Sequence, residues 1–323
     1  MGKAKVETTK RPIEEVMEEL EQGIKSVFES EKYKEMLRMT AKFHRYSLNN
    51  CILIAMQRPD ATYVAGYQTW QKTFHRAVNK GEKGIRILAP APYKVEKEKD
   101  QTKENGKPVL DENGRPKKEK MTITVPAYRV AYVFDISQTS GEPLPEIVET
   151  LDGKVENYVM YKSVLEKIAP CLVRYEHISG GANGYYSLDE KSVVVDENLS
   201  EEQTLKTLIH EITHAKLHDK DTGVDKDVCR NAAEVEAESV AYIVSEHLGI
   251  DSSQYSFGYV VGWSEGRNLP ELKACLSVIH DTAAEIIEQI GFKVSFDSEL
   301  KLTLKPEAEK MEQVVERHMQ MTI

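Results

Sequence analysis

Apolar residues recur at helical spacing near the start of the chain and alternate with polar residues further along. The spacing between residues 12 and 30, which opens with Pro12 at a helix-start position, predicts an amphipathic helix. A second helical stretch is expected over residues 32–57. From Met121 to Ile136 the pattern changes to alternation of β-branched and aromatic residues with polar ones, which predicts one or two strands pairing with residues 85–93.

The second half is mainly helical by the same criterion, with short strands before its central helix. Residues 151–169 have helical spacing, and strands are expected at 173–177, 184–186 and 191–196. Two helices follow, the first capped by Ser200-Glu201-Glu202-Gln203 as a capping box and the second over residues 231–244. Helices are expected again within 258–290, then a strand over 292–304 and a charged C-terminal helix.

These elements predict an α+β protein of two domains, which the 323 residues are long enough to form. We place an N-terminal α+β domain at 1–143 and a mainly helical domain with a small edge sheet at 144–323. Residues 94–120 are charged and poor in apolar residues, so we expect a flexible hairpin or disordered insert there. A helical extension from about residue 252 has no role that the sequence assigns.

Composition narrows the class of protein. A hydrophobic content of 40% and a charged content of 30% describe a globular chain, and no apolar run is long enough to span a membrane. The four cysteines show no C-x-x-C and no disulfide-framework spacing, which favours a reducing, cytoplasmic location. The net charge of −10 conceals an asymmetry: 26 basic and 20 acidic residues precede or include Pro145, and 17 and 33 follow it. Two domains with different partners are therefore expected.

The most informative motif is His210-Glu211-Ile212-Thr213-His214, inside an apolar-periodic run. On a helix, positions i and i+4 share a face, so His210 and His214 can offer two imidazole nitrogens to one tetrahedral Zn²⁺. Glu211 lies beside that face, where a general base for a zinc-bound water is needed. We expect His218, at i+8, to be a histidine at the helix end, because a fourth protein ligand would close the site. The strand at 192–195 is our candidate for an edge strand that pairs with an extended peptide.

A third ligand is expected on the Ala-rich helix downstream, where Glu234, Glu236 and Glu238 are all candidates. The sequence Glu234-Val235-Glu236-Ala237-Glu238 resembles the Glu-x-x-Ala-Glu signature of the ImmA/IrrE-like zinc metallopeptidases, whose ligand is the first acid. The resemblance implies that Glu234 ligates zinc and that Glu238 orients a ligand histidine from behind it. Tyr185 and Tyr242 are possible oxyanion-stabilising groups that the sequence does not decide between.

The first half carries several motifs that occur together in one family. They are, in order, Phe43-His44-x-Tyr46-Ser47-x-Asn49-Asn50, Gln57-x-Pro59-x-Ala61-Thr62-x-Val64-Ala65-Gly66-Tyr67-x-x-Trp70, Lys80-Gly81-Glu82-Lys83-Gly84 and Val133-Phe134-Asp135-Ile136-Ser137-Gln138-Thr139. This set resembles the single-stranded-DNA-binding domain of ArdC-type antirestriction proteins, a family that joins this domain to a C-terminal zincin. The resemblance implies a protein of conjugative elements that binds or guards incoming single-stranded DNA.

Single-strand binding needs a basic groove and aromatic faces on which bases stack, each stack contributing about 1–3 kcal/mol. The region between Lys32 and Lys94 supplies both types of residue. Our candidate DNA contacts are Arg45, Tyr46, Asn49, Asn50, Tyr67, Trp70, Lys80 and Lys83. Each aromatic among them also suits the core, and Trp70 suits either place equally.

Three functions remain open at this point. The first is a DNA-guarding protein with an active zinc peptidase, acting on an unknown protein or peptide. The second is a single-strand-binding protein whose zincin is silent, and the third is a regulatory peptidase that cleaves a repressor.

Overall fold

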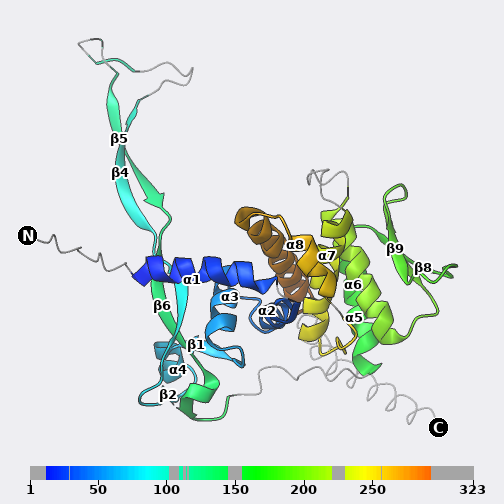
Figure 1. The fold of residues 1–323 in the computed structure, drawn as a ribbon. Coiled ribbons are helices and arrows are strands. Elements are labelled where there is room, and N and C mark those ends of the chain that lie inside the picture. Colours follow the sequence, from blue (N-terminus) through cyan, green and yellow to red (C-terminus); the bar gives the residue numbers. More distant parts are fainter. Residues whose placement is uncertain are drawn as a thin grey trace, which may run out of the picture. The chain divides into compact units, whose positions relative to one another are not determined.

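A computed structural model describes residues 12–28, 30–101, 109–111, 114, 116–144, 155–219, 230–255 and 257–291 (Figure 1). The strand expected at 292–304, the charged C-terminal helix and the centre of the 94–120 insert lie outside these residues. No helix among the described residues is long and apolar enough to cross a membrane.

The chain divides into two compact units that do not follow the sequence in two simple halves. The first unit comprises Met1–Glu21 and Tyr63–Gly141, and the second comprises Gln22–Thr62 and Glu142–Ile323. The division falls inside the first helix, α1 (Pro12–Val27), and not at the expected boundary near residue 143 alone. Residues 22–62 therefore fold with the unit that contains His210 and His214.

The first unit is built on antiparallel strands. Its elements are β1 (Val64–Gly66), α4 (Tyr67–Lys72), β2 (Arg76–Val78), β3 (Ile85–Pro90), β4 (Tyr93–Asp100), β5 (Lys118–Val125), β6 (Tyr128–Asp135), η1 (Ile136–Gln138) and β7 (Thr139–Gly141). A three-stranded sheet has the order β1-β6-β3, and β2 pairs with β7. The predicted pairing of 85–93 is confirmed for β6, whereas β5 pairs with β4 instead.

Trp70 is the centre of the first unit's core. Its side chain is fully buried, and its indole Nε1–H donates a 2.8 Å hydrogen bond to the carbonyl oxygen of Phe134. Tyr63 and Phe74 pack on it with ring centroids at 5.8 and 5.3 Å. A buried indole needs a partner for its N–H, and the strand carbonyl supplies it.

The Val133–Thr139 motif is a structural junction. The Asp135 carboxylate accepts hydrogen bonds from the backbone N–H groups of Tyr63 and Ser137, which caps η1. Gln138, buried, donates to the Glu82 carboxylate at 2.8 Å and to the Lys83 carbonyl oxygen at 2.9 Å. These contacts fix the basic turn at 80–84 against the end of β6, so Asp135 and Gln138 hold other residues in place.

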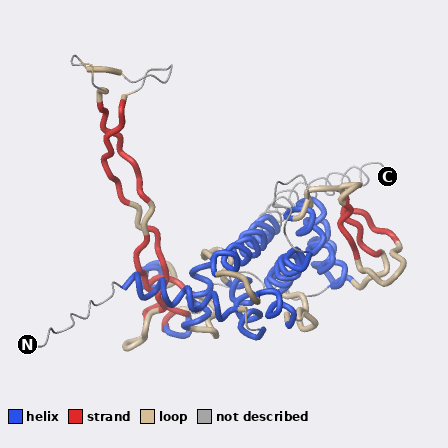
Figure 2. Tube along the Cα trace, turned by 45° about the horizontal axis from the view of Figure 1, so that its top comes forward, coloured by secondary structure: helices blue, strands red, loops and turns tan. Residues whose placement is uncertain are grey.

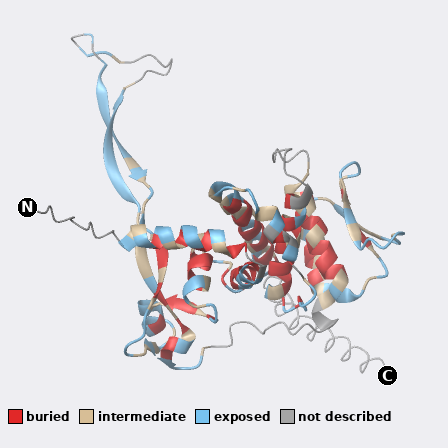
Figure 3. Cartoon of the chain, in the orientation of Figure 1, coloured by how far each residue is buried: buried red, intermediate tan, exposed pale blue. Residues whose placement is uncertain are grey.

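Strands β4 and β5 form a two-stranded ribbon, whose residues are mostly exposed (Figures 1 and 3). One face carries ion pairs across the strands, Lys120 with Glu96 and Lys118 with Glu98, both at 3.3 Å. The sequence left two expectations open for residues 94–120, a flexible hairpin or a disordered insert. The described residues form a hairpin of two regularly paired strands.

The second unit is mainly helical (Figure 2). Its elements are α2 (Ser30–Lys42), α3 (Leu48–Gln57), α5 (Val155–Ile168), β8 (Leu172–Glu176), β9 (Gly184–Ser187), β10 (Ser192–Asp196), α6 (Glu201–Leu217), α7 (Arg230–His247), α8 (Gly258–Ser264) and a helix over 269–291. Mixed helix and strand content, with helices and small sheets in both units, confirms the predicted α+β class.

The single helix expected over residues 32–57 is wrong. Residues 43–47 leave the helix between α2 and α3, and Ser47 begins α3 as an N-cap residue with extended backbone angles. The freed carbonyl oxygens of Phe43 and Tyr46 accept contacts from the Cys51 thiol. Serine is common at helix starts, although the Ser47 side chain makes no capping hydrogen bond here.

The small sheet of the second unit has the order β8-β10-β9. β10 pairs in parallel with β8 and antiparallel with β9, and Val193, Val194 and Val195 are fully buried. The expectation that residues 192–195 form an edge strand is therefore wrong, because both of its sides are already paired. A continuous apolar run of this kind is typical of a central strand.

Candidate metal centre

The helix α6 supplies most of the candidate site, and its sequence explains where it begins and what it buries. The Ser200 hydroxyl accepts a hydrogen bond from the Gln203 backbone N–H at 3.3 Å. The reciprocal half of the expected capping box is not made, and the Gln203 amide nitrogen donates to Thr207 Oγ1. Leu208, Ile209 and Ile212 are fully buried, and His210 and His214 occupy other positions of the helix, from which both reach Glu234 of α7.

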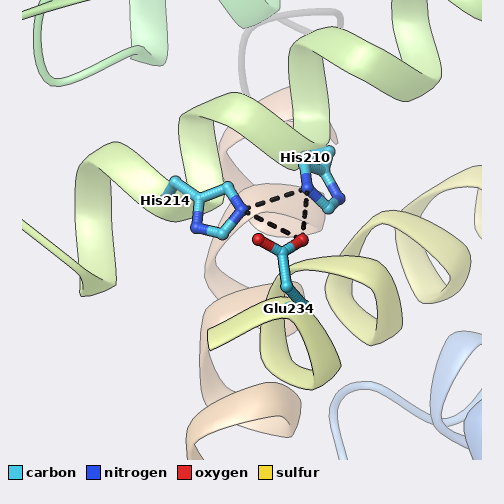
Figure 4. Close-up of side chains that lie close together, drawn as sticks. All are labelled: His210, His214 and Glu234. Atoms are coloured by element: carbon cyan, nitrogen blue, oxygen red, sulfur yellow. Dashed lines mark hydrogen bonds and ion pairs between the residues drawn. The ribbon is translucent and has the colours of Figure 1, made fainter. Parts of the chain in front are cut away.

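Glu234 comes from α7 and meets both histidines (Figure 4). One carboxylate oxygen of Glu234 lies 3.5 Å from His210 Nε2 and 3.8 Å from His214 Nε2, and the two Nε2 atoms are 3.0 Å apart. One donor atom from each of the three residues falls within 4.8 Å of the others. Two imidazole nitrogens and one carboxylate oxygen are the donor set of catalytic zinc sites and also suit other divalent first-row metals.

Burial and charge act on the same three side chains in opposite directions. Burial lowers the pKa of His210, but the Glu234 and Glu238 carboxylates outweigh it and raise that pKa to about 9. Burial lowers the pKa of His214, and the two histidines hold the pKa of Glu234 well below its usual range. A cation bound by these nitrogens replaces the proton that the carboxylates otherwise retain.

Glu211, the expected general base, is almost fully buried beside the histidines. Burial raises the pKa of its carboxyl to about 7, against the opposing effect of His210. Gly184 of β9 lies against it: a Cβ atom at Gly184 would be 3.3 Å from Glu211 Cγ and 2.6 Å from Thr207 Cγ2. The strand next to the candidate site is thus β9, at the sheet's edge, and not β10.

A cavity of about 360 Å³ opens in front of these groups. It is lined by Asn183, Gly184, Gln203, Lys206, Thr207, His210, Glu211, Glu238, Gln254 and Tyr255. Lys206 lies one turn before His210 and has only 8% of its surface exposed. The residues that line the cavity include no other lysine and no arginine. A cavity of this size beside a buried carboxylate is large enough for a few residues of an extended peptide.

Glu236 and Glu238, the other candidates for the third metal ligand, contact different atoms from those that Glu234 contacts. Glu238 lies behind His210, with its carboxylate 3.5 Å from His210 Nδ1, as the expectation of an orienting residue requires. Glu236 lies 3.0 Å from His218 Nε2, one turn of α6 beyond His214. His218 is at the helix end, as expected, since its backbone N–H closes the last turn onto the His214 carbonyl oxygen. The oxyanion candidates differ in exposure, Tyr242 being fully buried and Tyr185 45% exposed.

The residues expected to contact DNA do not all lie in one unit. Arg45, Tyr46, Asn49 and Asn50 belong to the second unit, where Asn50 is buried and the Tyr46 carbonyl oxygen faces His280 Nε2 at 2.8 Å. Arg45 is exposed, whereas Tyr46 and Asn49 are half-buried.

The other four candidates lie in the first unit. Tyr67, Lys80 and Lys83 are exposed, and Trp70 is not. Trp70 as a stacking platform is wrong, because both its ring and its N–H are used in the core.

Two tyrosines that the sequence reasoning did not single out complete an exposed aromatic face on the first unit. Tyr128 and Tyr132 of β6 are 58% and 56% exposed, and Tyr67 is 53% exposed. The Tyr67 and Phe134 rings are in edge contact at 6.4 Å, and a Cβ at Gly84 would lie 3.0 Å from Tyr132 and 3.1 Å from Phe134. Alternation along β6 places residues 128, 132 and 134 on one face, so the strand pattern in the sequence could have predicted this aromatic face.

Two family models match separate parts of the chain. The N-terminal domain of anti-restriction factor ArdC matches residues 7–134, and the IrrE N-terminal-like domain, of the M78 peptidases, matches residues 167–252. All three candidate metal ligands and Glu211 lie within the second match.

Individual relatives span the chain more widely. An uncharacterized Bacillus anthracis protein, pXO2-81, is 30% identical over 320 residues, covering 90% of this chain and 53% of that protein. The DNA primase TraC of Escherichia coli is 28% identical over 251 residues, covering 73% of this chain but 16% of the primase. The chain thus spans about half of the first relative and a small part of the second.

Among solved structures, the antirestriction ArdC protein of plasmid R388 is similar in two forms. The metal-free form has 19% identity and a TM-score of 0.45, over 76% of this chain and 84% of that one. The Mn(II)-bound form has 16% identity and a TM-score of 0.49, over 87% and 97%. The two family models thus match the chain in the order ArdC N-terminal domain, then IrrE-like domain of the M78 peptidases.

Proposed function

We propose that the second unit is a metal-dependent peptidase, with His210, His214 and Glu234 as the metal ligands. The observation that carries this proposal is the convergence of three donor atoms within 4.8 Å, with Glu211 next to them at the wall of a cavity. Zn²⁺ suits two imidazoles and a carboxylate with an open fourth position, and Mn²⁺ is the alternative that the same donors accept.

The cation would polarise the peptide carbonyl and lower the pKa of the attacking water. Glu211 takes a proton from that water as its oxygen bonds to the carbonyl carbon. The same proton goes to the amide nitrogen as the carbon–nitrogen bond breaks, so that Glu211 ends the reaction ionised as it began. Burial suits Glu211 to this exchange, because it raises the pKa of the carboxyl to about 7, close to working pH.

The cavity favours an extended peptide with an anionic group near the cleaved bond. β9 is an edge strand, so a peptide can add to it through backbone hydrogen bonds. Lys206 supplies the cation on the cavity wall, and the amides of Asn183, Gln203 and Gln254 offer neutral partners. We therefore assign substrates with Asp, Glu or a terminal carboxylate beside the cleaved bond.

The test compares Glu211→Gln with the unaltered protein on a mixture of quenched fluorescent peptides. We expect the variant to keep its metal, measured by elemental analysis, and to lose at least about 100-fold in cleavage rate. Glu202→Gln, in the exposed first turn of α6, is the matched control and should cleave normally. Cleavage by Glu211→Gln at the normal rate would disprove this mechanism, and absence of cleavage by every form would support a silent site.

For the first unit we propose single-stranded-DNA binding, with the exposed face of Tyr67, Tyr128 and Tyr132 as the stacking surface. The exposed Lys80 and Lys83 stand in the turn that Gln138 holds beside Gly84, and they supply phosphate contacts. Together the two units suit a mobile-element protein that guards or processes incoming DNA against restriction.

Binding is tested by fluorescence anisotropy with single- and double-stranded oligonucleotides over a salt series. We expect tighter single-strand binding with a steep salt dependence, and a loss of about 1–3 kcal/mol in Tyr132→Ala or Tyr67→Ala. Tyr185→Ala, which removes an equally exposed tyrosine from the second unit, should bind as the unaltered protein does. Equal affinity for single and double strands would overturn the assignment. His210→Ala separates the two activities, because it should remove cleavage and leave DNA binding unchanged.

A further inference from the structure

The two candidate ligand histidines are held from behind in different ways. His210 presents Nε2 to Glu234 and has the Glu238 carboxylate 3.5 Å from its Nδ1. His214 also presents Nε2 to Glu234, but its Nδ1 lies 2.8 Å from Nδ1 of His218. His218 in turn has its Nε2 3.0 Å from the Glu236 carboxylate. A line of polar contacts therefore runs from Glu234 through His214 and His218 to Glu236.

We infer that His218 and Glu236 form a positioning relay that fixes the ring and the tautomer of the metal ligand His214. This inference rests on the metal site proposed above. It gives a role to His218, which the sequence predicts only as a histidine at the helix end, and to Glu236, which the sequence offers only as an alternative ligand.

Proton accounting along the line gives a single arrangement. A metal on Nε2 of His214 leaves its Nδ1 as an N–H donor. His218 must then accept at Nδ1, so its own proton is on Nε2. That N–H donates to the Glu236 carboxylate. Both contacts of His218 then join a donor to an acceptor.

Burial makes the relay more consequential than a surface contact. The side chains of His218 and Glu236 are each only 12% exposed, less than either His210 or Glu234. Among buried groups, a broken hydrogen bond leaves its partner unsatisfied, which is more costly than at the surface. Glu236 also raises the pKa of the buried Cys275 thiol on the 269–291 helix, after burial itself, so that helix backs the relay.

The arrangement excludes a direct ligand role for either residue as they stand. His218 directs Nδ1 to His214 and Nε2 to Glu236, so neither nitrogen faces Glu234. Partners of this type behind a ligand histidine typically contribute 10–100-fold in metal affinity. A relay through a second histidine lets a carboxylate on α7 act on a ligand too far along α6 for direct contact.

The test measures metal affinity and apo stability in the same set of variants. Zn²⁺ affinity is determined by competition with a chromophoric chelator, and the thermal midpoint of the metal-free protein is recorded for each. His218→Leu should lose about 10–100-fold in affinity, as should Glu236→Leu. His218→Gln should stay within about threefold of the unaltered protein, because its amide can accept from His214 and donate to Glu236.

Each result decides something different. Unchanged affinity in His218→Leu, or an equal loss in His218→Leu and His218→Gln, would overturn the relay. Unchanged affinity in His210→Ala would instead overturn the metal site on which the relay rests. If the leucine variants do not fold, nitrogen-15 NMR of the Zn²⁺-loaded protein decides: His218 should carry its proton on Nε2 alone, and a proton on Nδ1 would contradict the inference.

Discussion

Gly184 of β9 lies against Glu211 of α6 at a distance that only a glycine allows. A Cβ atom there would be 3.3 Å from Glu211 Cγ, 2.6 Å from Thr207 Cγ2 and 2.8 Å from the Val194 carbonyl oxygen. The last of these is backbone of the central strand and cannot turn aside. The edge strand and the candidate general base are therefore set at their spacing by the absence of one methyl group.

Gly184→Ala is expected to reduce peptide cleavage at least about tenfold while leaving metal affinity within a few-fold. The added methyl must push β9 away from α6, which misplaces both Glu211 and the edge on which a peptide would lie, whereas neither His210 nor His214 is among the three nearest neighbours of the added methyl. Cleavage rate and Zn²⁺ affinity are measured side by side. Gly262→Ala, on α8, has nothing within 4 Å of the added Cβ and no left-handed backbone, so it is a control for the general effect of losing a glycine.

Trp70→Ala is expected to destabilise the first unit by about 3–5 kcal/mol, since it removes a fully buried ring and leaves the Phe134 carbonyl oxygen without its indole partner. Tyr67→Ala, three residues earlier and 53% exposed, should change stability little. Urea unfolding followed by circular dichroism distinguishes the two. Similar stabilities of the two variants would contradict a core role for Trp70.

Metal binding should stabilise the folded protein. At a free Zn²⁺ concentration 100 times the Kd, the free energy of unfolding should rise by about 2.7 kcal/mol, and a chelator should remove the gain. His210→Ala and Glu234→Ala should each show little or no rise in thermal midpoint. His177→Ala, an exposed histidine outside the cluster, should respond as the unaltered protein does.

Lys206→Ala is expected to narrow the difference between acidic and neutral substrates. Paired peptides that carry Glu or Gln beside the cleaved bond should differ about tenfold in kcat/KM with the unaltered protein and much less with the variant, because the variant lacks the cavity's cation. Lys167→Ala, an exposed lysine at the end of α5, should keep the preference. Equal kcat/KM for both peptides with the unaltered protein would overturn the substrate class and leave the peptidase itself standing.

Acid should weaken the second unit through His44. Burial, with the nearby His247, lowers the pKa of His44 to about 4, below the 6.5 of an unfolded chain. The unfolded state therefore binds more protons between these values, so stability is full above pH 6.5 and falls as the pH drops toward 4. Urea unfolding at several pH values should give a shallower fall for His44→Gln than for the unaltered protein. Equal falls would show that His44 is protonated equally well in both states.

The sequence predicted the parts of the site that lie on one helix and left open the parts that depend on contacts between helices. The i, i+4 spacing places His210 and His214 together on any α-helix. Nothing in that spacing says which of Glu234, Glu236 and Glu238 faces them, and the choice of Glu234 came from a family resemblance. The line from His214 to Glu236 needs the α6–α7 packing, which no local pattern contains.

Strand order and side-chain burial were the other points where sequence patterns were not enough. The apolar run Val193–Val195 is typical of a central strand, but the run does not identify the strands that pair with it. Trp70 suited the core and the DNA surface equally until its N–H was found on the Phe134 carbonyl oxygen. Tyr128 and Tyr132 lie outside the basic region between Lys32 and Lys94, so the sequence does not connect them with DNA binding.

Helix α2 has a consequence for how such proteins can be divided or recombined. The Tyr33 hydroxyl is 2.7 Å from Ser239 Oγ, both buried, so a residue within the ArdC match completes the core beneath the helix that carries Glu234. A fragment that starts at residue 144 would expose this core, and exchange of the N-terminal segment between relatives must keep α2 and α7 compatible. The compact unit around the candidate metal site is thus larger than the IrrE-like match at residues 167–252.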